Sequence, residues 1–135
     1  IMLLAVLNGT DTDQMVLESS FKISNRTKNT IIAVYVIIIP RDKPLDQDIP
    51  NLTEKGERIL QNAETLASDF KMKIRTQMLQ ARSKGVAVVN YVIEENVDLL
   101  ITGIDKNLGG RKLFLDSDTE YILLNSASKV ITCRL

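Results

Sequence analysis

VDLLITGIDKNLGGRKLFLDSDTEYILLNSASKVITCRL, which spans residues 97–135, carries the strongest indication of how this chain folds. Its apolar part, Leu99–Gly103, predicts a buried strand that ends at a single glycine. A basic loop, Ile104–Phe114, follows with Lys106, Arg111 and Lys112, and Ser117 with Glu120 predicts the capped start of a helix. In open α/β sheets, ligands bind beyond the carboxyl ends of the strands, where helix N-terminal amides attract anions. The segment therefore has the layout of a phosphate site.

Upstream, apolar runs alternate with segments of helical period, which is the pattern of βαβ units and a parallel sheet. The predicted strands are Met2–Leu7, Thr30–Ile38, Lys73–Leu79, Leu99–Gly103 and Lys129–Cys133. The first, second and fourth are apolar on both faces, as buried strands are, whereas the third alternates and indicates an edge. With 135 residues, 44% of them hydrophobic, the chain forms one α/β domain over residues 1–135.

Local signals predict the helix starts. Asp11 with Gln14, Asn51 with Glu54 and Ser117 with Glu120 each pair an N-cap residue with a side chain that can reach back. The second helix carries an apolar stripe that ends at Phe70, and a polar loop, Pro40–Pro50, precedes it.

The third helix is expected to run from near Ser83 to near Asn96. Ser83 is expected to cap this helix. Arg82, beside it, either lies in solvent or reaches the crevice at the switch point of the sheet or the surface of a partner.

Composition excludes several functions. The net charge is zero, which argues against non-specific nucleic-acid binding. With no histidine and one cysteine, Cys133, the chain lacks the usual material for a zinc site, a Ser-His nucleophile or a disulfide. The longest apolar run, residues 31–39, is far shorter than the roughly 20 residues that span a bilayer. We expect a cytoplasmic domain without membrane insertion, trimmed from a longer chain because it begins inside a strand.

The same segments resemble the universal stress protein family. Its C-terminal half carries Gly, two residues, Gly, nine residues, Gly, then Ser or Thr; the matching positions here are Gly103, Lys106, Asp116 and Ser117. MLLAVLNGT, LQARSKGVAVVNYVIEENVDLLITG and TEYILLNSASKVI extend the likeness over nearly the whole chain. The resemblance implies a three-layer α/β/α fold of the adenine nucleotide alpha hydrolase-like type, with a five-stranded parallel sheet of order 3-2-1-4-5.

Two residues near the first strand bear on whether a nucleotide binds. Where nucleotide-binding relatives have an Asp that contacts the adenosine, this chain has Leu7, which cannot accept a hydrogen bond. Asn8 either substitutes with its side-chain amide or only forms an Asn-Gly-Thr turn. Val36, at the position where relatives hold the base, is either part of an apolar wall or a core valine.

Of these residues, Asp116 argues most strongly against the binding of a phosphate group. A carboxylate about 5 Å from a phosphate charge costs about 0.8 kcal/mol in water and about 3 kcal/mol at an effective dielectric constant of about 20. That weakens binding by roughly fourfold to over a hundredfold. Ser117 is expected to form a capping box with Glu120 and so to occupy amides that a phosphate would use.

From this the sequence predicts a non-enzymatic regulatory module with a degenerate ATP site and no resident cofactor. The resemblance implies a homodimer that forms through the last strand, Val130–Cys133. The chain is more closely similar to the domains fused to bacterial amino-acid permeases, which share its GTDTD and LQARS segments. That likeness suggests a transporter as a partner. The alternative is a sensor that binds ATP, another adenine nucleotide or a cyclic dinucleotide through Gly103, Lys106 and Ser117. Enzymatic activity is not expected, because no general base is evident.

Overall fold

The computed structural model describes residues 1–24, 29–105 and 115–135. In chain order the elements are β1 (Met2–Val6), α1 (Thr12–Ser24), β2 (Thr30–Ile38), α2 (Pro50–Asp69), β3 (Arg75–Ala81), α3 (Lys84–Glu94), β4 (Leu99–Ile104), α4 (Ser117–Asn125) and β5 (Lys129–Arg134). The strands form one parallel sheet in the order β3-β2-β1-β4-β5, which confirms the predicted topology.

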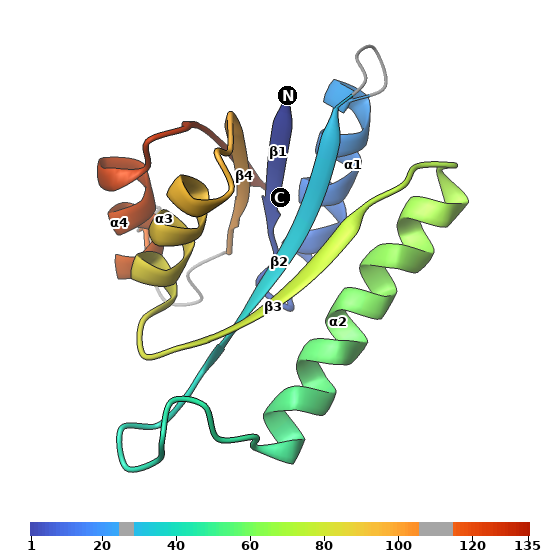
Figure 1. Ribbon diagram of the computed structural model, residues 1–135. Coiled ribbons are helices and arrows are strands. Elements are labelled where there is room, and N and C mark those ends of the chain that lie inside the picture. The colour runs from blue at the N-terminus through green and yellow to red at the C-terminus, as the bar shows by residue number, and fades with distance from the viewer. Residues whose placement is uncertain (25–28, 106–114) are drawn as a thin grey trace.

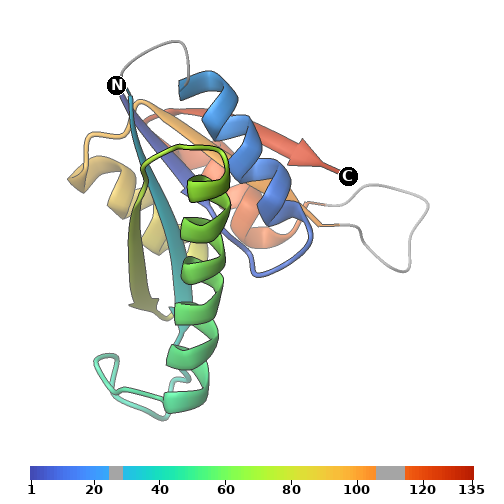
Figure 2. The same cartoon turned by 90° about the vertical axis from the view of Figure 1, so that its right-hand side faces the viewer.

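Helices cover both faces of the sheet. Figure 1 shows α3 and α4 on one side and α1 and α2 on the other, and Figure 2 shows α1 and α2 side by side across their face. Each face buries its own apolar cluster. One is centred on Leu3, Leu17 and Leu60 against α1 and α2, and the other on Leu4 and Leu100 against α3 and α4. Because alternate strand residues point to opposite faces, β1 contributes to both clusters. Its residues after Met2 are all buried, which confirms the prediction that this strand is buried on both faces.

The strand bounds differ from the predicted ones where pairing decides them. β3 runs from Arg75 to Ala81, two residues later than predicted, because Arg75 is the first residue that lies opposite β2, at Ile32. β3 pairs only with β2, so its predicted place at an edge is confirmed. β1 ends at Val6, yet the Leu7 amide still donates to the Val34 carbonyl at 2.9 Å.

Two predicted helix caps are wrong. α2 begins earlier than expected, with Ile49 as its N-cap and Pro50 in the first turn, so Asn51 lies inside the helix. Proline suits the first turn because the amide it lacks would have no intrahelical partner there. In α4 the N-cap is Asp116, whose side chain accepts the Thr119 amide. The expected capping box of Ser117 with Glu120 therefore does not start this helix.

The other helix ends follow the predictions more closely. α1 begins at Thr12, directly after Asp11, and α3 follows Ser83, although the Ser83 side chain makes no capping hydrogen bond. The stripe of α2 buries Gly56, Leu60, Ala63 and Ala67, but Phe70 lies at the helix end and is 45% exposed. No helix in the described ranges is long and apolar enough to cross a membrane.

Candidate functional site

The candidate site lies where β1 and β4 meet at their carboxyl ends. β1 is the central strand. The chain runs outward from β1 through β2 to β3 and then crosses back to β4 on the other side of β1, so the strand order reverses between β1 and β4. This is the position at which open α/β sheets bind ligands. Six side chains from four segments gather there, and we call them the switch-point cluster: Asn8, Asp13, Lys84, Asp105, Asp116 and Asp118.

Asn8 ties three elements together. Its side-chain Nδ2 donates to the Gly103 carbonyl at 3.1 Å, and its Oδ1 accepts a hydrogen bond from the Lys84 ammonium group. The end of β1 is thereby linked to the end of β4 and to the first residue of α3. Both polar ends of the Asn8 amide are satisfied by the protein itself.

Asp13 closes the turn that follows β1. Its two carboxylate oxygens accept the backbone amides of Asn8 at 2.7 Å and Gly9 at 2.8 Å. Burial raises the pKa of Asp13 above 3.8, while these two amides and the Lys84 charge act in the opposite direction. Two backbone donors at the carboxyl end of β1 are therefore already bound to an anion of the chain.

Asp105, directly after β4, is held by hydroxyl groups. Thr10 Oγ1 donates to Asp105 Oδ1 at 2.6 Å, and Thr12 Oγ1 lies 3.3 Å from the same oxygen. Thr12 is buried beneath this contact. The loop after β1 is thus bound to the loop after β4.

Two carboxylates occupy the starts of the helices. Asp116 Oδ1 accepts the Thr119 amide at 2.7 Å and Asp116 Oδ2 accepts the Thr119 hydroxyl at 3.1 Å, while Asp118 Oδ1 accepts the Gly85 amide at 2.9 Å. Amides at helix N-termini are the donors that would attract a bound anion. Here side chains of the protein bind them at both α3 and α4.

Among the residues that the structure describes, Lys84 is the single cation of the switch-point cluster. Burial lowers the pKa of its ammonium group below 10.5, and the carboxylates of Asp116, Asp118, Asp13 and Asp105 oppose that shift. Four carboxylates around one ammonium group leave an excess of negative charge. The electrostatics of the cluster therefore disfavour a polyphosphate.

The universal stress protein family model matches residues 2–134. The chain belongs to this family. A universal stress protein of Methanocaldococcus jannaschii is 20% identical over 133 residues, which cover 94% of this chain and 78% of that protein.

Solved structures of universal stress proteins share the fold. One from Archaeoglobus fulgidus has a TM-score of 0.80 and 14% identity, covering 98% of this chain and 92% of that one. An Arabidopsis thaliana family protein with AMP bound has a TM-score of 0.70 and 12% identity, covering 98% and 90%. The architecture of this universal stress protein domain is accordingly the adenine nucleotide alpha hydrolase-like fold expected from its sequence.

The structure separates some of the predicted site residues. Leu7 is buried in the core cluster against α1 and α2, whereas Val36 is buried in the opposite cluster, against α3. The two residues therefore do not line one surface. Ser117 is exposed as the first residue of α4, next to its N-cap Asp116. Lys106 lies outside the described residues.

Gly103 has a packing reason to be glycine. A Cβ built on Gly103 would overlap the side chain of Thr12, which lies against β4. The first glycine of the family pattern is thus explained by the close approach of α1 to the sheet.

Sequence reasoning missed Lys84, Asp13, Asp105 and Asp118 as members of the site. For Lys84 the sequence did hold a signal, because a cation at the first position of a helix opposes the helix dipole and needs nearby carboxylates. For the three aspartates no such signal exists, since only the tertiary fold brings them to one place.

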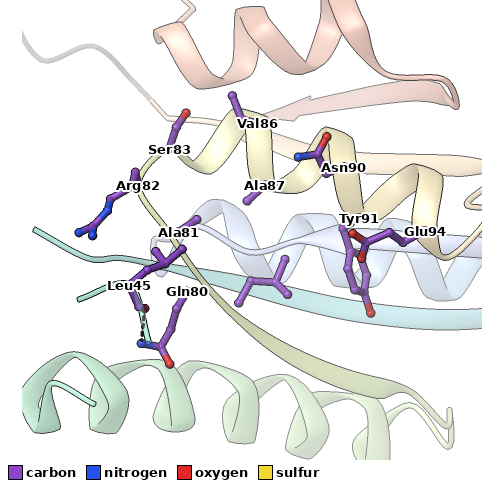
Figure 3. A pocket seen from close by; sticks show the side chains of 11 residues that line it. Leu45, Gln80, Ala81, Arg82, Ser83, Val86, Ala87, Asn90, Tyr91 and Glu94 are labelled. Atoms are coloured by element: carbon purple, nitrogen blue, oxygen red, sulfur yellow. Dashed lines mark hydrogen bonds between the residues drawn. The ribbon is translucent and has the colours of Figure 1, made fainter. Parts of the chain in front are cut away.

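Hollows lie on both sides of the switch-point cluster. One, of about 350 Å³, lies between α1 and α2, with Leu7 in its lining. The other, of about 360 Å³, lies between α3, the end of β3 and the loop before α2, and Figure 3 shows its lining. None of the residues predicted to bind a nucleotide lines the second hollow, but Arg82 and Ser83, which the sequence also singled out, do. Within the described ranges there is also no group of three or more acidic, His or Cys side chains placed to hold a metal ion.

Arg82 lines this second hollow. It is exposed, as one of the predicted alternatives has it, and its guanidinium group donates to the carbonyls of Ile39, Pro40 and Lys43. Gln80 Nε2 donates to the Leu45 and Gln47 carbonyls at 3.3 and 2.9 Å, as Figure 3 shows for Leu45. The two side chains fasten the loop before α2 to the end of β3.

Proposed function

We propose that this universal stress protein domain is a non-enzymatic regulatory module whose nucleotide site is degenerate. One observation carries the proposal: the amides that an anion would use at the switch point are already bound to carboxylates of the chain. Asp13 accepts the Asn8 and Gly9 amides, Asp118 accepts the Gly85 amide and Asp116 accepts the Thr119 amide. A phosphate group would have to displace these carboxylates and then lie among them.

The module acts through protein contact, and β5 supports this part of the proposal. β5 is an edge strand whose Ile131 is 38% exposed, and Leu135 follows it at 52% exposed. At the opposite edge, the Gln77 side chain donates to the Met78 carbonyl of β3 and covers that acceptor. Exposed Lys129 and Arg134 stand at the two ends of β5, but Val130–Cys133 between them carries no charge, and uncharged edge segments pair readily with another strand. A second copy of the chain, pairing through Val130–Cys133, is the proposed partner.

A transporter is the second proposed partner, suggested by the likeness of the GTDTD and LQARS segments to permease-fused domains. In the structure, LQARS includes Gln80 and Arg82, which fasten the loop before α2. These residues shape the surface beside α3 that such a partner would meet. In this setting the domain would work at the cytoplasmic side of a membrane.

Isothermal titration with ATP tests the degenerate site. We expect no binding heat at a protein concentration of about 100 μM, which is about tenfold above a dissociation constant of about 10 μM. Dissociation constants below that value would contradict the proposal.

The alternative function is a sensor that binds an adenine nucleotide, such as ATP, or a cyclic dinucleotide. It is favoured by the Arabidopsis thaliana relative with AMP bound, because a monophosphate brings less negative charge to the cluster than ATP does. Titration with AMP beside ATP separates the two functions. Binding of AMP without binding of ATP would favour the sensor.

A further inference from the structure

Asn8 is followed by Gly9, and this dipeptide is chemically unusual. In an Asn-Gly pair the backbone nitrogen of glycine can attack the side-chain carbonyl carbon of asparagine and close a five-membered succinimide ring. Glycine has no Cβ to hinder that approach and is free to adopt backbone conformations closed to other residues. Gly9 has a φ of 75°, in the region that favours glycine.

The fold surrounds this dipeptide with the groups that such a reaction needs. The Gly9 amide, which would attack, donates to Asp13 Oδ2 at 2.8 Å. The side-chain carbonyl oxygen of Asn8, Oδ1, which would become an oxyanion, accepts a hydrogen bond from the Lys84 ammonium group. The Asn8 Nδ2, which would leave, is oriented by the Gly103 carbonyl at 3.1 Å. A general base therefore contacts the Gly9 backbone amide, while an oxyanion donor and an acceptor that orients the leaving group contact the Asn8 side-chain amide.

We propose that Asn8 is a site of self-catalysed deamidation, with Asp13 as the general base and Lys84 as the oxyanion donor. Asp13 takes the proton of the Gly9 amide as the Gly9 nitrogen bonds to the Asn8 side-chain carbon. The bond from that carbon to Nδ2 then breaks, and ammonia leaves with a proton returned from Asp13. Water opens the succinimide at either carbonyl and leaves aspartate or isoaspartate at position 8.

The surroundings of the dipeptide suit both halves of this reaction. Burial raises the pKa of Asp13, which makes its carboxylate a stronger base than an exposed one. Gly9 and Thr10 are exposed, so water can reach the ring and ammonia can leave. The reaction needs no co-reactant other than water.

The product would change the switch-point cluster. A carboxylate at position 8 cannot donate a hydrogen bond, so the Gly103 carbonyl would lose its donor and the link from β1 to β4 would open. The new negative charge would instead face the Lys84 ammonium group. This timed, irreversible change goes beyond the proposed function and does not depend on whether ATP binds.

Peptide mass spectrometry after incubation at neutral pH tests the proposal, because replacing NH₂ with OH raises the mass of the peptide that contains Asn8. We expect the folded wild-type chain to deamidate at Asn8 about tenfold faster than the same chain unfolded in urea. This comparison needs no variant. Equal or slower reaction in the folded chain would overturn the proposal and show that the contacts protect Asn8.

Two variants identify the groups involved. Asp13→Asn and Lys84→Met should each slow the reaction of the folded chain by roughly tenfold or more and leave the rate in urea unchanged. Asp46→Asn and Lys55→Met, at exposed positions, are matched controls and should react like the wild type. Folded variants that deamidate at the wild-type rate would remove Asp13 and Lys84 from the reaction.

Discussion

Asp116 Oδ1 accepts the backbone amide of Thr119 at 2.7 Å, so the residue that replaces a family glycine is also the N-cap of α4. One side chain therefore does two things. It satisfies an amide at the start of the helix, and it places a negative charge where a phosphate would bind. Substitutions can separate these two effects.

The capping effect predicts unequal stability losses. Asp116→Ala should lower the free energy of unfolding by about 1 kcal/mol, within a range of roughly 0.5–2 kcal/mol, because the Thr119 amide loses its acceptor. Ser117→Ala, one residue later, should change it by less than about 0.5 kcal/mol. Urea denaturation of both variants measures the difference. A larger loss from Ser117→Ala would restore Ser117 as the cap.

The charge effect predicts a gain of ATP affinity. Asp116→Gly should bind ATP roughly one to two decades more tightly than the wild type, because it removes a repelling carboxylate. Asp116→Asn keeps a capping oxygen without the charge and should recover most of that gain. Titration of both variants with ATP decides whether charge limits the site, and a gain in the glycine variant alone would point to backbone shape instead. The Lys106→Gly variant should gain no affinity, because it removes an attractive charge.

Gly103→Ala should destabilise the fold by about 1–3 kcal/mol, because the added methyl group overlaps the Thr12 side chain. The matched test is Gly103→Ala combined with Thr12→Ala, which empties that space. We expect the double variant to lose less stability than the sum of the two single variants, as measured by thermal unfolding. Additive losses would mean that the overlap does not decide the choice of glycine.

The last strand predicts the oligomeric state. Sedimentation at tens of micromolar (about 10–100 μM) should show a wild-type dimer, and Ile131→Lys should shift it toward monomer by placing a charge on the paired edge. Ile93→Lys, at a position of α3 that is 61% exposed, is the control and should leave the dimer intact. A wild-type monomer would end the proposal of pairing through β5.

Lys84 predicts how stability depends on pH. Burial lowers the pKa of Lys84 from 10.5, so the folded chain releases this proton at a lower pH than the unfolded chain does. The stability of the wild type relative to Lys84→Met should therefore rise with pH between the pKa of the folded state and 10.5. Urea denaturation of the two chains at stepped pH values measures this difference. A flat or falling difference would contradict the assigned burial.

The sequence by itself determined the sheet. Its alternating apolar and helical segments indicated the βαβ units, and the resemblance carried by Gly103, Lys106, Asp116 and Ser117 implied the order of the strands, which the structure has. Burial on both faces could be predicted for β1, β2 and β4 because apolar residues occupy both alternations of those strands. Such patterns are local, and a single chain segment displays them.

Only the tertiary structure decided the switch-point cluster. Asn8, Lys84 and Asp118 are far apart in the sequence, and nothing local to any of them indicates that Lys84 donates to Asn8 or that Asp118 accepts the Gly85 amide. The caps at Ile49 and Asp116 were likewise decided by the structure, because several neighbouring residues could cap each helix and only the folded chain shows which of them does. Hydrogen bonds and charges between distant segments depend on the folded arrangement, which brings them within a few ångströms of one another.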